Sequence, residues 1–303
     1  MPQRGTHGGM ATAAAPEAVD AGGDGAARGY RAGRTLPLHV EVRRQLTRRR
    51  TTLTLGLLVV LPFLLVAAFE LNRDGRRGRD TPGLVDLATS GAGNFTLFTL
   101  FVATGFLLVV VFALFAGDTV ASEASWSSLR YLLAAPVPRG RLLRQKLLVA
   151  VGFALFSLLL LPAVAYLAGG LFFGWAPLHT PLGATLGVGE GLWRLAVIVG
   201  YLFVTLLFVA SLAFLLGVWT DAPLGAVGGA VLLVIVSNIL DAVTALGDLR
   251  RFLPTHYAYA WTDALGADIT WDAMVRGALW SVAYSALFLA LAWRHFLRKD
   301  IVS

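Results

Sequence analysis

Lysine, histidine and serine are the side chains through which this 303-residue chain could bind phosphate or catalyse a covalent step. Its two lysines, Lys146 and Lys299, lie outside any G-x-x-x-x-G-K-[ST] loop, the pattern that wraps backbone amides around nucleotide phosphates. The five histidines lack the paired spacing of a zinc site, and no serine lies in a G-x-S-x-G turn. We therefore predict that the chain is not an enzyme and binds no metal or cofactor itself.

Ionisable residues are also nearly absent from the long apolar blocks of the chain. Asp221 and Asp241 flank the fifth block, and Arg294 lies near the end of the sixth. Transporters driven by protons or ions usually keep carboxylates or histidines at membrane depth, where these groups are costly and therefore functional. The sequence thus predicts that any coupling energy enters from outside the bilayer.

The composition is that of a membrane protein, because 57% of the residues are hydrophobic and only 14% are charged. The apolar residues form blocks that reach the roughly 20 residues needed to cross a bilayer. The net charge of +7 comes from arginines at the ends of these blocks, which favours membrane orientation over nucleic-acid binding. Without cysteine no disulfide can form. We expect an all-α integral membrane protein with six spans, at about 52–70, 95–116, 147–169, 195–219, 222–240 and 277–297.

The chain before the first span divides into two parts. Residues 1–34 are rich in Ala, Gly and Arg without a hydrophobic period, which predicts a disordered tail. Leu38, Val42 and Leu46 then recur at helical spacing, with Pro37 near the start. This pattern predicts a short helix in the membrane interface, and a soluble amphipathic helix is the alternative. Residues 35–303 are expected to form a single transmembrane domain.

Lysine and arginine are distributed unequally between the two sides of the predicted spans. Most of them lie before the first span, between spans two and three, or after the last span. This bias predicts that both termini are cytoplasmic, although the arginines of residues 73–79 in the first outer loop oppose it. We expect a multi-pass protein of the cytoplasmic membrane, surrounded by lipid.

The segment between spans two and three, residues 117–146, has its own pattern. It reads as a helix, a break and a second helix, with Asp118 placed to cap the first helix at its N-terminus. Trp126, Leu129 and Leu133 form an apolar stripe on that helix, which ends at two prolines, Pro136 and Pro138. A basic stretch from Arg139 to Lys146 leads into span three.

This segment resembles the signature of the ABC type-2 permeases, the membrane subunits of one class of ABC exporters. The matching positions are Asp118, Glu123, Ser127-Ser128, Leu132-Leu133, Pro136-Val137, Arg139 and Lys146. The departure is Ser127, where the family commonly has glycine. The order of interfacial helix, six spans and long outer loop extends the resemblance over nearly the whole chain. The importer type of ABC permease is not supported, because no glycine lies between Gly117 and Gly140.

The resemblance implies that the segment forms a coupling helix docked on a separate ATPase subunit. Its docking and coupling residues would be Asp118, Glu123, Trp126, Arg130 and Arg139. Two ATPase copies would bind ATP and magnesium, and two permease copies, most simply a homodimer, would enclose the pathway. The substrate would cross by alternating access. The alternative for single residues is local: Asp118 only caps a helix, and Glu123 only pairs with an arginine such as Arg130.

Two further features leave alternatives open. Gly225 and Gly229 form a G-x-x-x-G in span five, which lets backbones approach closely at a subunit interface or within the chain. Residues 241–276 are polar and aromatic and form either short helices that dip into the outer leaflet or an ordinary outer loop. The rival to the exporter function is a membrane scaffold or assembly factor that binds partners through residues 117–146 without transport.

Overall fold

A computed structural model describes residues 38–71, 84–125, 139–180 and 185–298. The described chain is almost entirely helical, and its helices are consistent with an all-α, multi-pass membrane protein. The tail predicted over 1–34 lies outside the described residues. Five helices are long and apolar enough to cross a membrane, namely α2 (Arg49–Leu71), α8 (Arg139–Phe173), α9 (Val188–Thr220), α10 (Pro223–Ala242) and α11 (Asp272–Arg298).

A sixth candidate span is broken into two helices. α5 (Ala92–Thr104) and α6 (Leu107–Ser125) are bent by 60° at the break between them. The break lies against another part of the chain, because a Cβ on Gly105 would lie 2.6 Å from the hydroxyl oxygen of Tyr259. The prediction of one continuous span over 95–116 is therefore wrong at this point, where the absence of a side chain permits the close approach.

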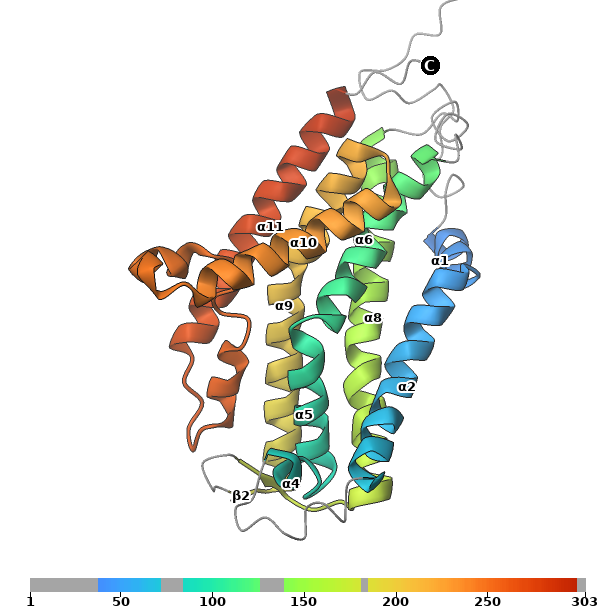
Figure 1. Cartoon of the computed structure of the whole chain (residues 1–303). Helices are drawn as coiled ribbons and strands as arrows, with labels where there is room; N and C mark the ends of the chain where they lie inside the picture. The colour runs from blue at the N-terminus through green and yellow to red at the C-terminus, as the bar shows by residue number, and fades with distance from the viewer. Residues whose placement is uncertain (1–37, 72–83, 126–138, 181–184, 299–303) are drawn as a thin grey trace, which may run out of the picture.

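The helices form a bundle around α9 (Figure 1). In α9, 61% of the most apolar stretch is buried within the chain, against 22% in α2, α10 and α11. α9 packs on α6, α10 and α11, while α8 packs on α2, α5 and α6. A helix that is apolar all round suits either a protein core or lipid, so the less buried helices present side chains for a bilayer.

The short elements gather at opposite ends of the bundle (Figure 1). The predicted helix before the first span is present as α1 (Leu38–Leu46), beside the start of α2. At the other end lie α4 (Leu84–Ala88) and an antiparallel pair of strands, β1 (Leu178–His179) and β2 (Thr185–Leu186). Asn94 in the first turn of α5 holds β1, because its amide donates to the His179 carbonyl at 2.6 Å.

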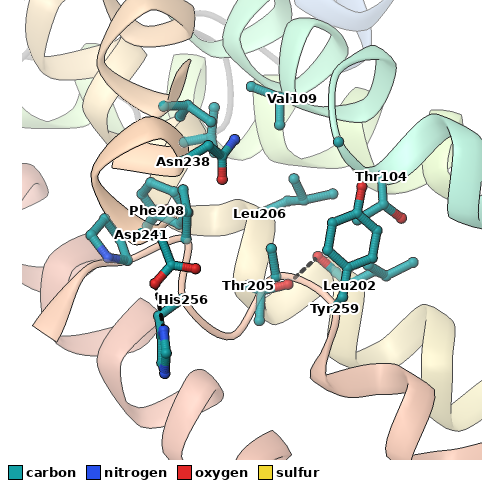
Figure 2. A pocket seen from close by; sticks show the side chains of 16 residues that line it. Thr104, Val109, Leu202, Thr205, Leu206, Phe208, Asn238, Asp241, His256 and Tyr259 are labelled. Atoms are coloured by element: carbon teal, nitrogen blue, oxygen red, sulfur yellow. Dashed lines mark hydrogen bonds and ion pairs between the residues drawn. The ribbon is translucent and has the colours of Figure 1, made fainter. Parts of the chain in front are cut away.

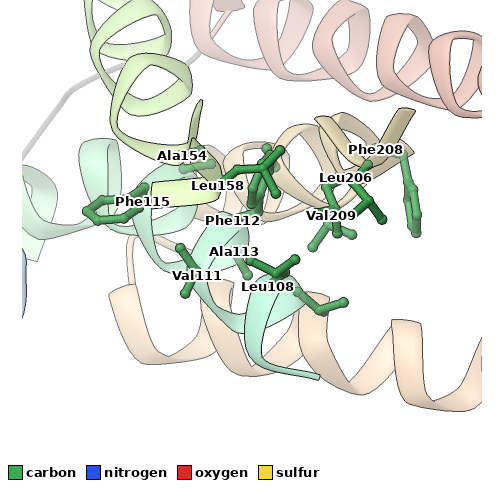
Figure 3. Close-up of a cluster of buried hydrophobic side chains, with 14 of the residues drawn as sticks. Leu108, Val111, Phe112, Ala113, Phe115, Ala154, Leu158, Leu206, Phe208 and Val209 are labelled. Atoms are coloured by element: carbon green, nitrogen blue, oxygen red, sulfur yellow. The ribbon is translucent and has the colours of Figure 1, made fainter. Parts of the chain in front are cut away.

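α6 packs between α8 and α9 through buried apolar side chains (Figure 3). The Phe115 ring of α6 stacks on Phe153 of α8, with 5.6 Å between the ring centroids. The tightest approach of α6 and α9 is at two glycines, since a Cβ on Gly217 would lie 2.6 Å from the carbonyl oxygen of Gly117. Small residues at such a contact let two helix backbones pack closely.

The structure corrects the predicted cap at Asp118. α6 continues through Gly117 and Asp118 to Ser125, so Asp118 lies inside a helix and caps nothing. Gly117, the residue before it, lies at the close contact with Gly217 of α9.

Residues 243–271 contain two 3-10 helices, η1 (Thr244–Phe252), which packs on α10, and η2 (Ala260–Leu265), which packs on α9 and α11. Trp261 is 1% exposed, and the Tyr201 hydroxyl of α9 donates to the Tyr257 carbonyl at 2.6 Å. The region therefore contains short helices, as one of the two alternatives predicted, and their entry into the outer leaflet stays a prediction.

Candidate functional site

The two helices that flank residues 126–138 are both tied to the N-terminal helices by ion pairs. On α6, the Asp118 carboxylate is 6% exposed and accepts a hydrogen bond from Arg48 Nη1 at 2.9 Å. Arg50 pairs with the other oxygen of the same carboxylate. Arg48 also donates to the Ser122 hydroxyl at 3.1 Å. α6 is thereby fixed to the junction of α1 and α2.

The second tie joins α8 to α1. Lys146, in the second turn of α8, is only 3% exposed, and its Nζ lies 3.6 Å from Glu41 Oε1. Glu41 also lies 3.7 Å from Arg44 on α1. A buried lysine is costly unless it has a partner, which makes this contact specific to the folded chain. We call Asp118, Arg48, Arg50, Lys146 and Glu41 the ion-paired corner.

Asp118 and Lys146 thus act inside the chain, at the α1 end of the bundle. Glu123 lies in the last turns of α6, and Arg139 begins α8. Trp126 and Arg130 lie outside the described residues, and the side chains of Glu123 and Arg139 are not described. Docking of these residues on an ATPase stays a prediction.

The glycine pair predicted to support close packing lies on α10. Gly225 is exposed, and a Cβ there would meet only ordinary contacts with Ala222 at 3.6 Å and Thr220 at 3.8 Å. A Cβ on Gly229 would lie 3.1 Å from the Leu216 side chain of α9. Gly229 therefore makes an intrachain contact, while the exposed Gly225 leaves the subunit interface open.

A polar cavity of about 340 Å³ lies beside the break between α5 and α6 (Figure 2). Its lining includes Thr104 at the end of α5, Thr205 on α9, and Asp241 at the end of α10. His256 and Tyr259 close it from the 243–271 segment. The Asp241 carboxylate contacts His256, with Oδ1 and Nδ1 2.5 Å apart.

The sequence analysis missed this cavity. The α9 residues that line it run from Leu202 to Val209, which is the middle of that helix. A carboxylate and an imidazole therefore line a cavity beside the middle of α9, which the sequence did not indicate. Asp241 was taken to flank a span, but α10 runs obliquely and brings its end to the middle of α9 (Figure 1). Among the described residues, no three His, Asp or Glu side chains converge as metal ligands.

Arg194 is a second residue whose place the sequence did not reveal. The predicted fourth span begins at residue 195, which leaves Arg194 just outside it, but in the structure Arg194 is 4% exposed in α9. Its guanidinium pairs with Glu190 at 2.9 Å and donates to the carbonyls of Ala264 at 3.0 Å and Ala267 at 2.9 Å. A single arginine thus holds the end of η2 against the start of α9, because its planar group offers several donors at once.

Comparison with known families matches this architecture to one of them. The family model described as "Protein of unknown function (DUF2705)" covers residues 83–302. The chain belongs to the DUF2705 family. The DUF2705 match takes in α4 to α11, the cavity, and the Asp118 and Lys146 side of the ion-paired corner. It leaves out α1 and α2, which supply Glu41, Arg48 and Arg50. No curated protein matches the chain.

Proposed function

We propose that this protein is the membrane-spanning permease subunit of an ATP-driven type-2 ABC exporter. Two copies pair in the cytoplasmic membrane, and two copies of a separate ATPase bind ATP and magnesium. The permease catalyses no covalent step and moves its substrate by alternating access. The proposal starts from the signature of residues 117–146. The ion-paired corner supports it, because these contacts could transmit motion from that segment to the helices.

The observation that carries the proposal is that both helices flanking residues 126–138 are attached to the N-terminal helices α1 and α2. Asp118 makes the attachment on α6, and Lys146 makes it on α8. A force applied to residues 126–138 would therefore move α1, α2, α6 and α8 together. Such a connection is what a coupling element needs, because an ATPase can act on the pathway only through contacts that transmit its motion.

The break between α5 and α6 could serve as the hinge for that motion. α6 is anchored at the ion-paired corner, and its other end at Leu107 follows the 60° bend beside the polar cavity. Hinges in domain motions are a few residues at the ends of elements. We infer that α6 tilts about Gly105 and Phe106 when the coupling segment moves, which opens or closes the cavity at the middle of α9.

The orientation follows from the same end of the bundle. The basic residues of α1, the start of α2 and the start of α8 gather where the 126–138 segment leaves the helices. Positively charged residues favour the cytoplasmic side. Both termini and the coupling segment would then face the cytoplasm, where an ATPase is available.

The proposal is tested by coupling to an ATPase. The partner to use is an ABC ATPase encoded by a neighbouring gene, coexpressed with the tagged permease. Trp126→Ala and Glu123→Arg should insert normally but copurify less ATPase, because buried aromatic side chains commonly dominate an interface. The control is Trp193→Ala, which removes a 57% exposed tryptophan near the start of α9, away from residues 126–138.

Reconstitution separates the exporter from the scaffold. In proteoliposomes an exporter makes ATP hydrolysis depend on its substrate, whereas a scaffold binds the ATPase without such dependence. If both coupling variants copurify the ATPase and stimulate its ATP hydrolysis as well as wild type does, residues 117–146 are not the coupling element.

A further inference from the structure

The cavity beside the α5–α6 break has the features of a binding site for a charged ligand. We propose that it binds an amphipathic organic cation, with the positive charge on Asp241 and the apolar body against α9. The inference rests on the proposed function only in making this cation the transported cargo. Binding itself depends on the permease chain alone.

Asp241 supplies the negative charge. One carboxylate oxygen contacts His256, and the other points toward the cavity in the direction of Thr205 (Figure 2). No described arginine or lysine side chain forms an ion pair with this carboxylate, although Arg250 donates to the backbone carbonyl of Asp241 at 3.2 Å. The Asp241 side chain is 28% exposed, so its carboxylate is accessible to a ligand.

Two threonine hydroxyl groups in the cavity favour a ligand that donates hydrogen bonds. Thr104 is 4% exposed and donates to the Leu100 carbonyl at 2.7 Å, while Thr205 donates to the Tyr201 carbonyl at 3.0 Å. Since each hydroxyl has a single hydrogen, both oxygens remain to the cavity as acceptors. These two oxygens can accept hydrogen bonds from an ammonium group, and Asn238 and Tyr259 add polar groups to the lining.

The remainder of the lining fits an apolar body. Leu202, Leu206, Phe208 and Val209 line the space from α9. The Tyr259 ring lies beside Leu202 and Thr104 (Figure 2). Aromatic faces attract cations, and a desolvated contact is stronger than an exposed one. A volume of about 340 Å³ is more than a proton or a metal ion needs and lies within the range of small-molecule sites.

His256 holds the Asp241 carboxylate at the edge of the cavity. Its Nδ1 lies 2.5 Å from Asp241 Oδ1, and a neutral imidazole that donates this hydrogen bond leaves the pair with one negative charge. The Tyr257 ring packs on the imidazole, with 4.8 Å between the ring centroids.

The test measures binding by the purified full-length chain in detergent, without an ATPase. The probes are benzyltrimethylammonium, a permanent cation, and neopentylbenzene, its neutral carbon isostere, both titrated by calorimetry. Wild type should bind the cation saturably and at least about tenfold more tightly than the isostere. Asp241→Asn should remove most of that preference, while Asp248→Asn should not, because Asp248 is exposed on η1 with 84% of its side-chain surface accessible.

His256→Gln gives the third arm. It keeps a hydrogen-bond donor beside Asp241 and removes the imidazole, so the preference for the cation over the isostere should persist. Equal affinity for the two probes, absence of saturable binding, or unchanged binding by Asp241→Asn would overturn the inference. Since no ATPase is present, a chain that binds the cation but no ATPase would retain this site and remove the exporter function.

Discussion

Asp118 on α6 and Arg48 at the junction of α1 and α2 are joined by a 2.9 Å ion pair that is largely shielded from solvent. The pair connects α6, which precedes residues 126–138, to the N-terminal helices. The contact of Lys146 with Glu41 connects α8, which follows these residues, to α1. The ion-paired corner thus joins α6 and α8 to the same N-terminal helices. It also assigns Asp118 to internal positioning, a role that the sequence pattern did not distinguish from helix capping.

Replacement of Asp118 should lower the stability of the protein. Asp118→Asn removes the charge that satisfies both Arg48 and Arg50, so we expect a loss of about 2 kcal/mol in stability. Thermal unfolding in detergent measures it. Asp248→Asn, at an exposed surface pair, should change stability by less than about 0.5 kcal/mol. Equal melting temperatures for Asp118→Asn and wild type would show that the ion pairs contribute nothing.

The contact between Gly117 and Gly217 should tolerate no added side chain. Gly217→Ala places a Cβ 2.6 Å from the Gly117 carbonyl oxygen and should cost about 1–3 kcal/mol by separating α6 from α9. Gly152→Ala is the matched control, because nothing lies within 4 Å of its Cβ position. It should leave the melting temperature unchanged or raise it, as alanine favours helix. A Gly217→Ala variant as stable as Gly152→Ala would contradict the close packing.

The exposed Gly225 separates the two uses of the G-x-x-x-G pattern. Gly225→Leu meets only ordinary contacts within the chain, so the fold of one copy should persist. If α10 packs against a second permease copy through this glycine, the larger side chain should dissociate the dimer. Light scattering of the purified protein in detergent gives the mass. A dimer that survives Gly225→Leu would exclude this position from the interface.

The absence of cysteine makes the topology directly measurable. Ser127→Cys and Ser303→Cys should resist a membrane-impermeant maleimide applied to intact cells, whereas Ser90→Cys should react. The expectation follows from the basic residues at the α1 end of the bundle. Ser127→Cys labelled from outside, with Ser90→Cys protected, would reverse the orientation.

The long apolar helices could be predicted because span length and composition are local properties of the sequence. α2, α8, α9, α10 and α11 each contain the corresponding predicted span or nearly all of it. Pro62 and Pro162 both lie inside continuous helices. The α5–α6 break was not predictable, because apolar residues continue on both sides of Gly105 and the residue that approaches it, Tyr259, is distant in the sequence.

The cavity could not be predicted for a related reason. Asp241 and His256 are 15 positions apart in the sequence, with η1 between them, and meet only because the chain turns back after η1. Each residue alone has the pattern of an isolated surface group. A signal was present in the polar and aromatic character of residues 241–276, but composition does not reveal which partners converge.

Contact between residues 126–138 and an ATPase is measured most directly by cross-linking from one position. Ser127→Cys in the otherwise cysteine-free chain can carry a photoreactive maleimide, and illumination of the coexpressed complex then reports what lies beside it. We predict a covalent adduct with the ABC ATPase that is absent from Ser90→Cys and reduced by Trp126→Ala. An ATPase that copurifies but forms no adduct with Ser127→Cys, or forms an equal adduct with Ser90→Cys, would contradict coupling through this segment.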